Sequence, residues 1–306
     1  MIQKILAIHA LSPLHCGSGQ GISGIDIPIQ RERHTQWPCL PSSSIKGVLR
    51  DAFRSKLVDQ EQAQSLDQAE SHPKTLALFG SEPTGVELGL GALIVGDAFL
   101  LLMPVRSMTG VFAWATCPLA LTRLQRLLQH AGRPQEAAKL VNVLKLVPEG
   151  QVFASAVMNV ATQPDRVILE DHSLTRKDLP TDLVGLLSSL LPPQPEEFIA
   201  NHLALVSDDL FTWFAVHATS IEARIRLDVE TKTVKDGALF YEETLPPEAV
   251  LMAPLNAEDA RHPKADPKLR QAASAIKEVE TLVQGCSLQF GGKATIGRGQ
   301  CALRLN

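Results

Sequence analysis

The stretch SSSIKGVLRDAFRSKL, residues 42–57, predicts a helix that begins near Ser43 and buries one apolar stripe. Its serines can act as the N-cap, because a serine hydroxyl accepts a free backbone N–H group of the first helical turn. Upstream, the apolar residues 5–10 predict the first β-strand. The long segment 12–41 joins this strand to the helix. Loops of such length without regular structure are usually functional, so we expect a site there.

The rest of the chain mixes strands and helices without strict alternation, which indicates an α+β fold. The patterns predict buried strands at 89–105, helices after Pro118 and at 134–145, strands at 220–228 and 238–243, a helix at 269–284 that stops at Gly285, and two short strands within 286–305. We expect one elaborated domain over residues 1–306, with residues 162–209 forming an insertion. The charged, proline-containing residues 256–268 predict a mobile loop.

Composition limits the class of protein. The chain has 306 residues, of which 45% are hydrophobic, enough to bury a substantial core. Its net charge of -4 argues against a protein that coats nucleic acid through overall basicity, so any RNA site must be a local basic stripe. The first residues lack the continuous apolar region of a signal peptide, and no stretch is typical of a membrane span. We therefore expect a cytoplasmic protein with no membrane partner.

Motifs of several common chemistries are missing from the sequence. There is no G-x-S-x-G, no H-E-x-x-H and no tight carboxylate pair, which disfavours hydrolases of those types. The five cysteines contain no C-x-x-C pair, which argues against a disulfide framework or a structural zinc site. We expect the cysteines to be small core residues.

The segment 12–41 carries an acid close to two basic residues. Asp26 opens the run DIPIQRER, in which Arg31 and Arg33 follow. Asp26 could hold a hard cation near phosphates that the two arginines attract. The alternative is a turn acid with surface salt bridges to Glu32. His15 lies nearby in sequence, but a single loop histidine is more often a hydrogen-bonding group than a catalyst.

The predicted helix carries a basic face. Lys46, Arg50 and Arg54 fall four residues apart, so they lie on one side, away from the apolar stripe. The helix start adds free backbone N–H donors that suit an anion. The alternative interpretation is a solvated basic face.

The closing glycine-rich loop is a second candidate phosphate site. Residues 291–299, GGKATIGRG, combine four glycines with Lys293 and Arg298, which could form a backbone cradle for phosphates, although a plain hairpin loop is the alternative. Farther upstream, Glu242 and Glu243 point to opposite faces if their segment is a strand. At most one of them can then share a site with Asp26.

Taken together, several stretches resemble the RAMP superfamily. They are PLHCGSGQG (13–21), IDIPIQRERHT (25–35), LPSSSIKGVLR (40–50), PVRSMTGVFAWATCP (104–118), DGALFYEETLP (236–246) and FGGKATIGRG (290–299). The likeness is greatest to the backbone subunit of the type III-B CRISPR effector, the Cmr complex, and it spans nearly the whole chain. It is weakest at residues 162–209. One departure is Ser42, which stands where the superfamily often has glycine and alters the backbone approach expected there.

The resemblance implies a ferredoxin-like core, similar to the RNA-recognition fold, with large insertions that include a thumb wedged into the guide–target duplex. Copies of such a protein stack head to tail along CRISPR guide RNA, with other type III-B effector subunits. The acid of the DIPIQR motif, here Asp26, is implied to be needed for cleavage of single-stranded target RNA at regular intervals, with Mg²⁺ or Mn²⁺ as cofactor. The chemistry is reasonable, because bending the RNA can align a ribose 2′-hydroxyl with its own phosphate while a cation held by Asp26 offsets the developing charge.

The resemblance also assigns roles to other residues. His15 and Glu243 are implied to support cleavage, with Glu243 favoured over Glu242. Base pairing would provide sequence recognition, while the protein holds backbone and shape. The residues implied to contact RNA are basic, small or polar, namely Arg31, Arg33, Ser43, Lys46, Arg50, Gly291, Gly292, Lys293 and Arg298.

Two other functions stay open from the sequence. The chain could be a scaffold of the same fold that coats guide RNA without cutting, because many superfamily relatives are scaffolds and Asp26 is a single acid. It could also be a free-standing metal-dependent enzyme that uses its two glycine-rich loops on a small phosphorylated substrate. Self-association distinguishes this enzyme from an RNA-binding subunit. A subunit that follows a long RNA should form filaments or co-purify with RNA, whereas a small-molecule enzyme should do neither.

Overall fold

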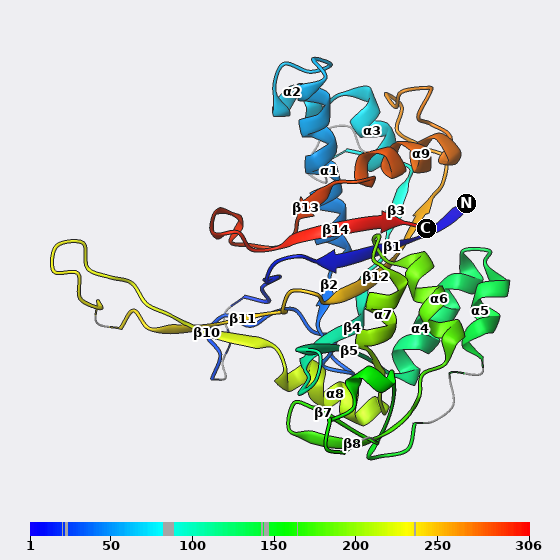
Figure 1. Ribbon diagram of the computed structural model, residues 1–306. Helices are drawn as coiled ribbons and strands as arrows, with labels where there is room; N and C mark the ends of the chain where they lie inside the picture. Colours follow the sequence, from blue (N-terminus) through cyan, green and yellow to red (C-terminus); the bar gives the residue numbers. More distant parts are fainter. Residues whose placement is uncertain are drawn as a thin grey trace.

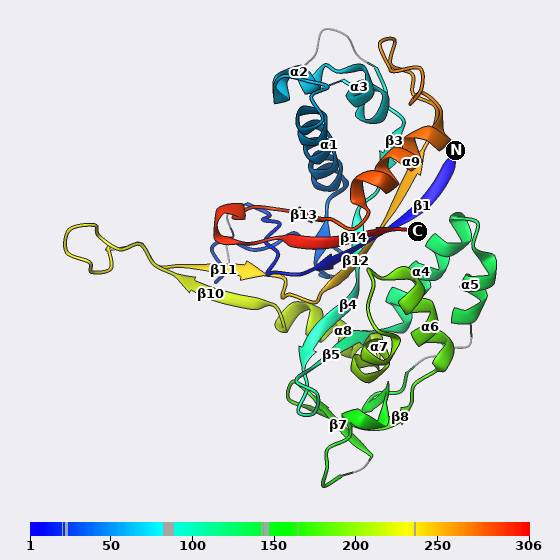
Figure 2. The same ribbon diagram turned by 45° about the horizontal axis from the view of Figure 1, so that its top comes forward.

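The computed structural model describes residues 1–19, 21, 24–81, 89–141, 143, 147–163, 165–235 and 237–306. Helices and strands mix around one large sheet, which confirms the α+β prediction (Figure 1). A narrow two-stranded arm projects away from this body in both views (Figures 1 and 2).

The large sheet is mixed. Its spatial order is β13-β14-β1-β12-β4-β5-β9-β6-β8-β7, while β2 pairs with β4 and β3 with β12. Neighbouring strands are antiparallel except for the parallel pairs β5 with β9 and β6 with β8. The strands are β1 (Ile2–Ala10), β2 (Cys39–Leu40), β3 (Leu93–Val95), β4 (Ala98–Arg106), β5 (Phe112–Thr116), β6 (Gln151–Ala154), β7 (Arg166–Leu169), β8 (His172–Asp178), β9 (Leu203–Leu205), β12 (Val250–Ala257), β13 (Ser287–Gln289) and β14 (Gln300–Leu305).

Helices cover both faces of this sheet (Figure 2). On one face α1 contacts β3 and β13, and α9 contacts β12 and β14, while α4 and α8 contact β4 from the other face. The helices are α1 (Ser42–Asp59), α2 (Leu66–Glu70), α3 (Pro73–Phe79), α4 (Pro118–His130), α5 (Pro134–Leu140), α6 (Thr181–Leu190), α7 (Glu196–His202), α8 (Asp208–His217) and α9 (Ala272–Val283).

β1 is an interior strand of the sheet, paired with β12 on one side and β14 on the other. The first predicted strand is confirmed and begins three residues earlier than expected, at Ile2. Every residue from 5 to 10 is buried, because helices cover both faces of the sheet. A strand enclosed in this way gives a continuous apolar run instead of alternation. The one polar residue in the run, His9, places its Nε2 atom 2.8 Å from Glu248 Oε2.

α1 confirms the predicted helix and its buried stripe, formed by Ile45, Leu49, Phe53 and Leu57. The predicted serine N-cap is wrong. Pro41 occupies that position without a side-chain cap, and the carboxylate of Asp97 accepts the Ser42 backbone N–H at 2.6 Å instead. A carboxylate at a helix start also interacts favourably with the helix dipole.

Most other predicted elements are present. α4 begins at Pro118 as expected, and α9 is followed by Gly285 with a φ of 69°. α5 ends at Leu140, and residues 142, 144 and 145 of the predicted longer helix lie outside the described residues. The predicted loop 256–268 begins two residues late, because β12 runs to Ala257.

Residues 162–209 are integrated into the sheet. They form β7, β8, α6, α7 and β9 before α8 begins. β9 lies between β5 and β6 inside the sheet, whereas β8 and β7 lie at one edge of it. The segment therefore supplies both an interior strand and edge strands. Its status as an insertion stays a prediction.

The arm consists of β10 (Ser220–Arg224) and β11 (Phe240–Thr244), which form a separate two-stranded sheet, and the residues between them. β10 is shorter than predicted, and its exposure alternates along the strand as expected for a half-exposed strand. The arm carries large hydrophobic side chains that are exposed, namely Ile221, Ile225, Leu227, Val229, Val234, Leu239 and Tyr241. Exposed apolar groups in this number mark a surface that contacts a partner.

The cysteines are free thiols, two of them fully buried. Burial raises the pKa of Cys301 to about 12. Burial, together with nearby acidic groups, raises the pKa of Cys39 to about 11. These thiols stay protonated at neutral pH, which suits small core residues. Across the described part of the chain, no helix has the length and apolar character needed to cross a membrane.

Candidate nucleic-acid interface

Asp26 lies at the foot of the arm, on a segment that pairs with the outer edge of β11. The Ile27 backbone N–H donates to the Tyr241 carbonyl at 3.1 Å, and the Glu243 N–H donates to the Ile27 carbonyl at 3.0 Å. Asp26 is exposed, and its Oδ2 atom accepts the Tyr241 backbone N–H at 2.8 Å. The arrangement fixes an exposed carboxylate at one position beside the arm.

Glu243 is 2% exposed, and both of its carboxylate oxygens have partners. Oε1 accepts from Arg31 Nη2 at 2.5 Å and from the Thr219 hydroxyl at 2.8 Å. Oε2 accepts the Ile29 backbone N–H at 3.1 Å. These bonds occupy the carboxylate that was predicted to assist cleavage.

Glu242 points to the other face of β11, as strand alternation requires. It is completely buried, yet neither carboxylate oxygen accepts a hydrogen bond from any described residue. Two cations and a histidine ring lie near it: Arg224 Nε and Lys293 Nζ are 3.4 and 3.7 Å from Oε2, and His15 Nδ1 is 4.0 Å from Oε1. Such a buried, charged but unbonded group calls for an explanation.

His15 and the glycine-rich loop pack against this same face. The His15 ring is buried, and its Nδ1 donates to the Glu243 backbone carbonyl at 2.7 Å. The Gly292 N–H donates to the His15 carbonyl at 2.9 Å. Gly291 has a φ of 73°, and a Cβ atom there would lie 2.1 Å from the same carbonyl, so only glycine fits this close approach.

The two basic residues of this loop have different surroundings. Arg298 is 7% exposed, and its Nη2 donates to Glu222 on β10 at 2.6 Å. That hydrogen bond holds the pKa of Glu222 below its ordinary value. The Lys293 side chain is 37% exposed, and its ammonium lies 5.7 Å from the centre of the Phe240 ring. Arg298 therefore ties the loop to the arm, whereas Lys293 can reach solvent.

Arg31 and Arg33 have different surroundings, and Arg33 lies in the turn formed by residues 33–35. Arg31 donates through Nη1 to the carbonyls of Ala215 and Gln36, at 2.8 and 2.6 Å, in addition to its bond with Glu243. Arg33 is exposed. Of these two predicted RNA contacts, only Arg33 presents its side chain to solvent.

The N-terminal end of α1 borders a cavity of about 490 Å³ that Ser43 and Lys46 help to line. The Lys46 ammonium donates to the Leu93 carbonyl at 3.1 Å. Burial, together with the charge of Arg50, lowers the pKa of Lys46. A phosphate placed here would offset the cost of burying the ammonium.

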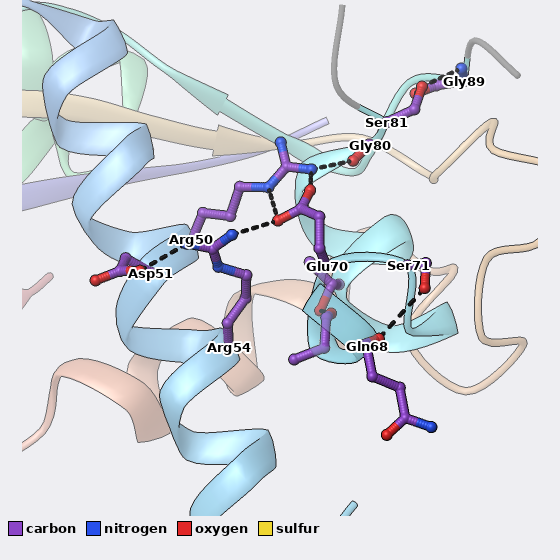
Figure 3. A network of polar contacts seen from close by, with 11 residues as sticks. Arg50, Asp51, Arg54, Gln68, Glu70, Ser71, Gly80, Ser81 and Gly89 are labelled. Carbon is purple, nitrogen blue, oxygen red and sulfur yellow. Dashed lines mark hydrogen bonds and ion pairs between the residues drawn. The ribbon is translucent and has the colours of Figure 1, made fainter. Parts of the chain in front are cut away.

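Arg50 takes part in a network between α1 and α2 (Figure 3). Its guanidinium is hydrogen-bonded to the carboxylate of Glu70 through Nε and Nη2, and Nη2 also donates to the Gly80 carbonyl at 3.2 Å. Arg54 Nη1 reaches the same Glu70 carboxylate at 2.9 Å. The network stabilises the packing of α2 on α1, and the predicted contact of Arg50 with RNA stays a prediction.

The structure thus brings two groups of predicted residues together. Around the foot of the arm it collects His15, Asp26, Glu243, Arg31 and the loop 291–299. Ser43, Lys46 and Arg50 form a second group on α1. Glu222 and Arg224 were not among the predicted site residues, although their positions two residues apart in a predicted strand already placed them on one face. Within the described ranges, no group of three or more His, Cys, Asp and Glu side chains forms a metal cluster.

Comparison with known proteins decides the family. The model of the RAMP superfamily matches residues 7–302. The chain belongs to the RAMP superfamily. The resemblance inferred from the motifs is therefore confirmed over almost the whole length of this RAMP chain.

Two curated relatives carry more specific names. The CRISPR system Cmr endoribonuclease Cmr4 of Pyrococcus furiosus is 33% identical over 303 residues, which cover 96% of this chain and 92% of the relative. The CRISPR system CMR subunit Cmr4 of Saccharolobus solfataricus is 23% identical, with coverages of 98% and 96%.

Solved structures agree with the family assignment. The crystal structure of oligomeric Cmr4 from Pyrococcus furiosus superimposes on this RAMP chain with a TM-score of 0.69, at 28% identity, covering 100% of this chain and 98% of that one. A chain of the type III-B Cmr-beta complex bound to cognate target RNA has a TM-score of 0.70 at 20% identity, covering 100% and 97% of the two chains, and shows the shared fold.

Proposed function

We propose that this RAMP chain is the repeated backbone subunit of a type III-B CRISPR effector, which binds guide RNA and cleaves the paired target RNA at regular intervals. The observation that carries the proposal is the position of Asp26, an exposed carboxylate that is held by the Tyr241 backbone N–H of β11, one of the two strands of the arm. The family and the name of the 33% identical relative support an endoribonuclease subunit.

The architecture suits this role. β1, α1, β3–β4, β12, α9 and β14 follow one another along the chain, and the strands lie in the order β14-β1-β12-β4. A β-α-β-β-α-β ferredoxin-like fold arranges its strands in this way, so we assign the core to that fold, with the elements from β5 to β11 as insertions. We assign the thumb to the β10–β11 arm, because it projects from the body and exposes apolar side chains that could wedge between bases.

The proposed RNA contacts use the cations that can reach solvent. Arg33 and Lys293 are exposed or half-exposed, and Ser43 with Lys46 lies at a helix start, where backbone N–H groups attract phosphate. The glycines of the loop let its backbone approach RNA closely. We expect these contacts to hold the guide backbone while base pairing selects the target.

The proposed cleavage is attack of a ribose 2′-oxygen on its adjacent phosphorus. The new bond forms as the bond to the 5′-oxygen breaks, leaving a 2′,3′-cyclic phosphate and a 5′-hydroxyl, so one proton must leave the nucleophile and one must reach the leaving oxygen. A divalent cation, Mg²⁺ or Mn²⁺, would supply positive charge against the phosphate during this exchange. Asp26 fits such a cation, because magnesium is often bound by one or two carboxylates together with substrate phosphates.

Among the supporting residues we favour Glu242 over Glu243. The Glu243 carboxylate is fully hydrogen-bonded, whereas Glu242 has no hydrogen bond and faces Lys293 and Arg224. The Nδ1 atom of His15 is bonded to the Glu243 carbonyl and its own carbonyl accepts the Gly292 N–H, so we assign it to positioning Glu242 and the glycine-rich loop. RNA phosphates would draw Lys293 away from Glu242 and leave that carboxylate free to accept a proton.

The proposal includes partners and location. We expect copies of the chain to stack head to tail along guide RNA, together with other type III-B subunits, in the cytoplasm. An oligomeric relative and a relative within a complex bound to target RNA support this expectation.

The deciding experiment assembles the chain with guide RNA and its partner subunits, adds labelled target RNA with Mg²⁺ or Mn²⁺, and compares wild type with Asp26→Asn. Evenly spaced products that disappear in the variant, with target affinity retained, would support the guided ribonuclease. Intact target with both proteins would favour the scaffold function. Cleavage that continues in the variant would reject Asp26 as the required acid.

A further inference from the structure

We propose that the buried Arg31–Glu243 ion pair is a positioning device that holds Asp26 against the arm. The inference rests on the proposed role of Asp26 in cleavage. It gives Arg31 and Glu243 a function other than RNA binding or direct participation in the reaction.

The pairing of the Asp26 segment with β11 is incomplete as a backbone ladder. Ile27 forms both of its backbone bonds, to the Tyr241 carbonyl and from the Glu243 N–H. In a regular parallel ladder the next bond would run from the Ile29 N–H to the Glu243 carbonyl. That carbonyl instead accepts from His15 Nδ1 at 2.7 Å.

The side chain of Glu243 replaces the missing acceptor. Its Oε2 atom accepts the Ile29 N–H at 3.1 Å. Pro28 lies between the two bonded residues and has no N–H group of its own. The bonds of Ile27 and Ile29 are therefore the ones that attach this run to β11, and one of them depends on the carboxylate.

Arg31 fixes the direction of that carboxylate. Its Nη2 atom holds Oε1 at 2.5 Å, and Thr219 adds a second donor at 2.8 Å, which leaves Oε2 for Ile29. Arg31 is itself anchored on the carbonyls of Ala215 and Gln36. The Arg31 and Glu243 side chains are 17% and 3% exposed, so water cannot easily replace either partner.

The effect reaches Asp26 through the chain. Asp26 directly precedes Ile27 and bonds to the backbone N–H of Tyr241 at 2.8 Å. If the Ile29 bond is lost, the described backbone of the run keeps its bonds to residues 16–21 but is bonded to β11 only at Ile27, and the carboxylate of Asp26 can move away from Tyr241. A displacement of about 1 Å at a reacting group can lower a rate about 100-fold.

The test uses Glu243→Gln, with Glu32→Gln as a matched control. The glutamine keeps the size of the side chain but replaces one carboxylate oxygen with an NH2 group, so either Ile29 or Arg31 faces a donor in place of its acceptor. Glu32 pairs with Arg123 at 2.8 and 2.9 Å from the same loop, but it attaches the loop to α4 and not to β11. Each variant weakens an ion pair between a glutamate and a partly buried arginine. Of the two glutamates, only Glu243 accepts the Ile29 N–H of the Asp26 segment.

Two measurements separate positioning from general stability. The first is hydrogen–deuterium exchange of peptides spanning residues 26–31 in the full-length, RNA-free chain. The second is the single-turnover cleavage rate of the assembled complex at saturating target RNA, beside its target affinity. For Glu243→Gln we expect faster exchange in this peptide and cleavage slowed at least ~10-fold, with affinity unchanged. For Glu32→Gln we expect both to stay within about twofold of wild type.

Equal slowing of cleavage by the two variants would overturn the inference, as would wild-type exchange in Glu243→Gln. If Glu243→Gln does not fold, Thr219→Val removes one donor to Oε1 at little cost in shape and should slow cleavage by about 2–3-fold. Unchanged exchange and cleavage in Thr219→Val would also overturn it. Continued cleavage by Asp26→Asn would reject the proposed function separately, and exchange of residues 26–31 in Glu243→Gln would then still decide whether the pair holds the segment.

Discussion

Glu242 and Glu243 are neighbours on β11, equally buried and identical in chemistry, yet their surroundings differ completely. On one face, Glu243 accepts three hydrogen bonds from Arg31, Thr219 and Ile29. On the other, Glu242 accepts none and is approached by Lys293 and Arg224 at 3.4–3.7 Å. The hydrogen bonds of the Glu243 carboxylate hold neighbouring segments together. The Glu242 carboxylate accepts no hydrogen bond from a described residue, so its oxygens can still accept a donor or a proton.

The partners of the two glutamates differ in the same way. Arg31 is 17% exposed and held by two backbone carbonyls as well. Lys293 and Arg224 are 37% and 32% exposed, so they can turn to solvent or to a phosphate when it arrives. Burial alone therefore does not distinguish the two carboxylates, whereas the number of hydrogen bonds that each accepts does.

The largest expected effect is on stability. Glu243→Ala leaves Arg31 buried without its counter-charge and should lower the free energy of unfolding by about 3–5 kcal/mol. Glu242→Ala should cost only about 1 kcal/mol, because Lys293 and Arg224 can become solvated. Urea unfolding of the RNA-free chain measures both values. Equal losses of unfolding free energy in Glu243→Ala and Glu242→Ala would show that the hydrogen bonds of Glu243 do not make it more important for stability than Glu242.

The second effect concerns RNA affinity. Lys293→Met should weaken guide RNA binding and reduce the slope of log K against log salt by about 0.7, the value for one phosphate contact on a single strand. Arg31→Met should leave that slope unchanged, because its guanidinium is used by Glu243 and two carbonyls. A salt series of binding titrations decides between them. A loss of slope with Arg31→Met would return this arginine to the RNA-binding residues.

The sequence predicted most of the fold, because its periodic patterns are strong. The apolar run at 5–10, the stripe along α1 and the proline start of α4 each depend on local spacing, and each is present in the structure. The N-cap of α1 could not be predicted, since its acceptor is Asp97, far along the chain and brought near by the packing of β4. The course of residues 162–209 through the sheet depends on long-range pairing in the same way.

The two glutamates of β11 show what the sequence could and could not predict about the candidate site. Strand alternation correctly placed Glu242 and Glu243 on opposite faces. The hydrogen-bond partners of each glutamate could not be predicted, because Arg31 lies 212 positions from Glu243 in the sequence. The partners of the basic residues of α1 could not be predicted either. Arg50 forms hydrogen bonds with Glu70 and the Gly80 carbonyl only because α2 folds back onto α1.

A smaller effect extends the comparison to α1, where Lys46 and Arg50 occupy one face. Arg50→Ala removes bonds to Glu70 and Gly80 and should lower stability by about 1–2 kcal/mol without changing the salt slope of guide binding. Lys46→Ala should do the reverse, reducing the slope by about 0.7 with little loss of stability. Thermal unfolding and binding titrations of both variants test this. A salt slope reduced by Arg50→Ala would show that RNA displaces Glu70.

The smallest effect is a pH dependence on the control pair. Burial alone would raise the pKa of Glu32, but hydrogen bonds from Arg123 and Thr35 outweigh it and leave the pKa below the ordinary value of 4.5. A carboxyl group whose pKa is lower in the folded state stabilises the fold above its unfolded pKa, and this contribution disappears as the pH falls through the folded pKa. The difference in unfolding free energy between wild type and Glu32→Gln should therefore be full above about pH 5 and shrink in acid. Urea unfolding across that range measures it, and a difference that does not change with pH would mean that Arg123 stabilises the loop through packing and not through its charge.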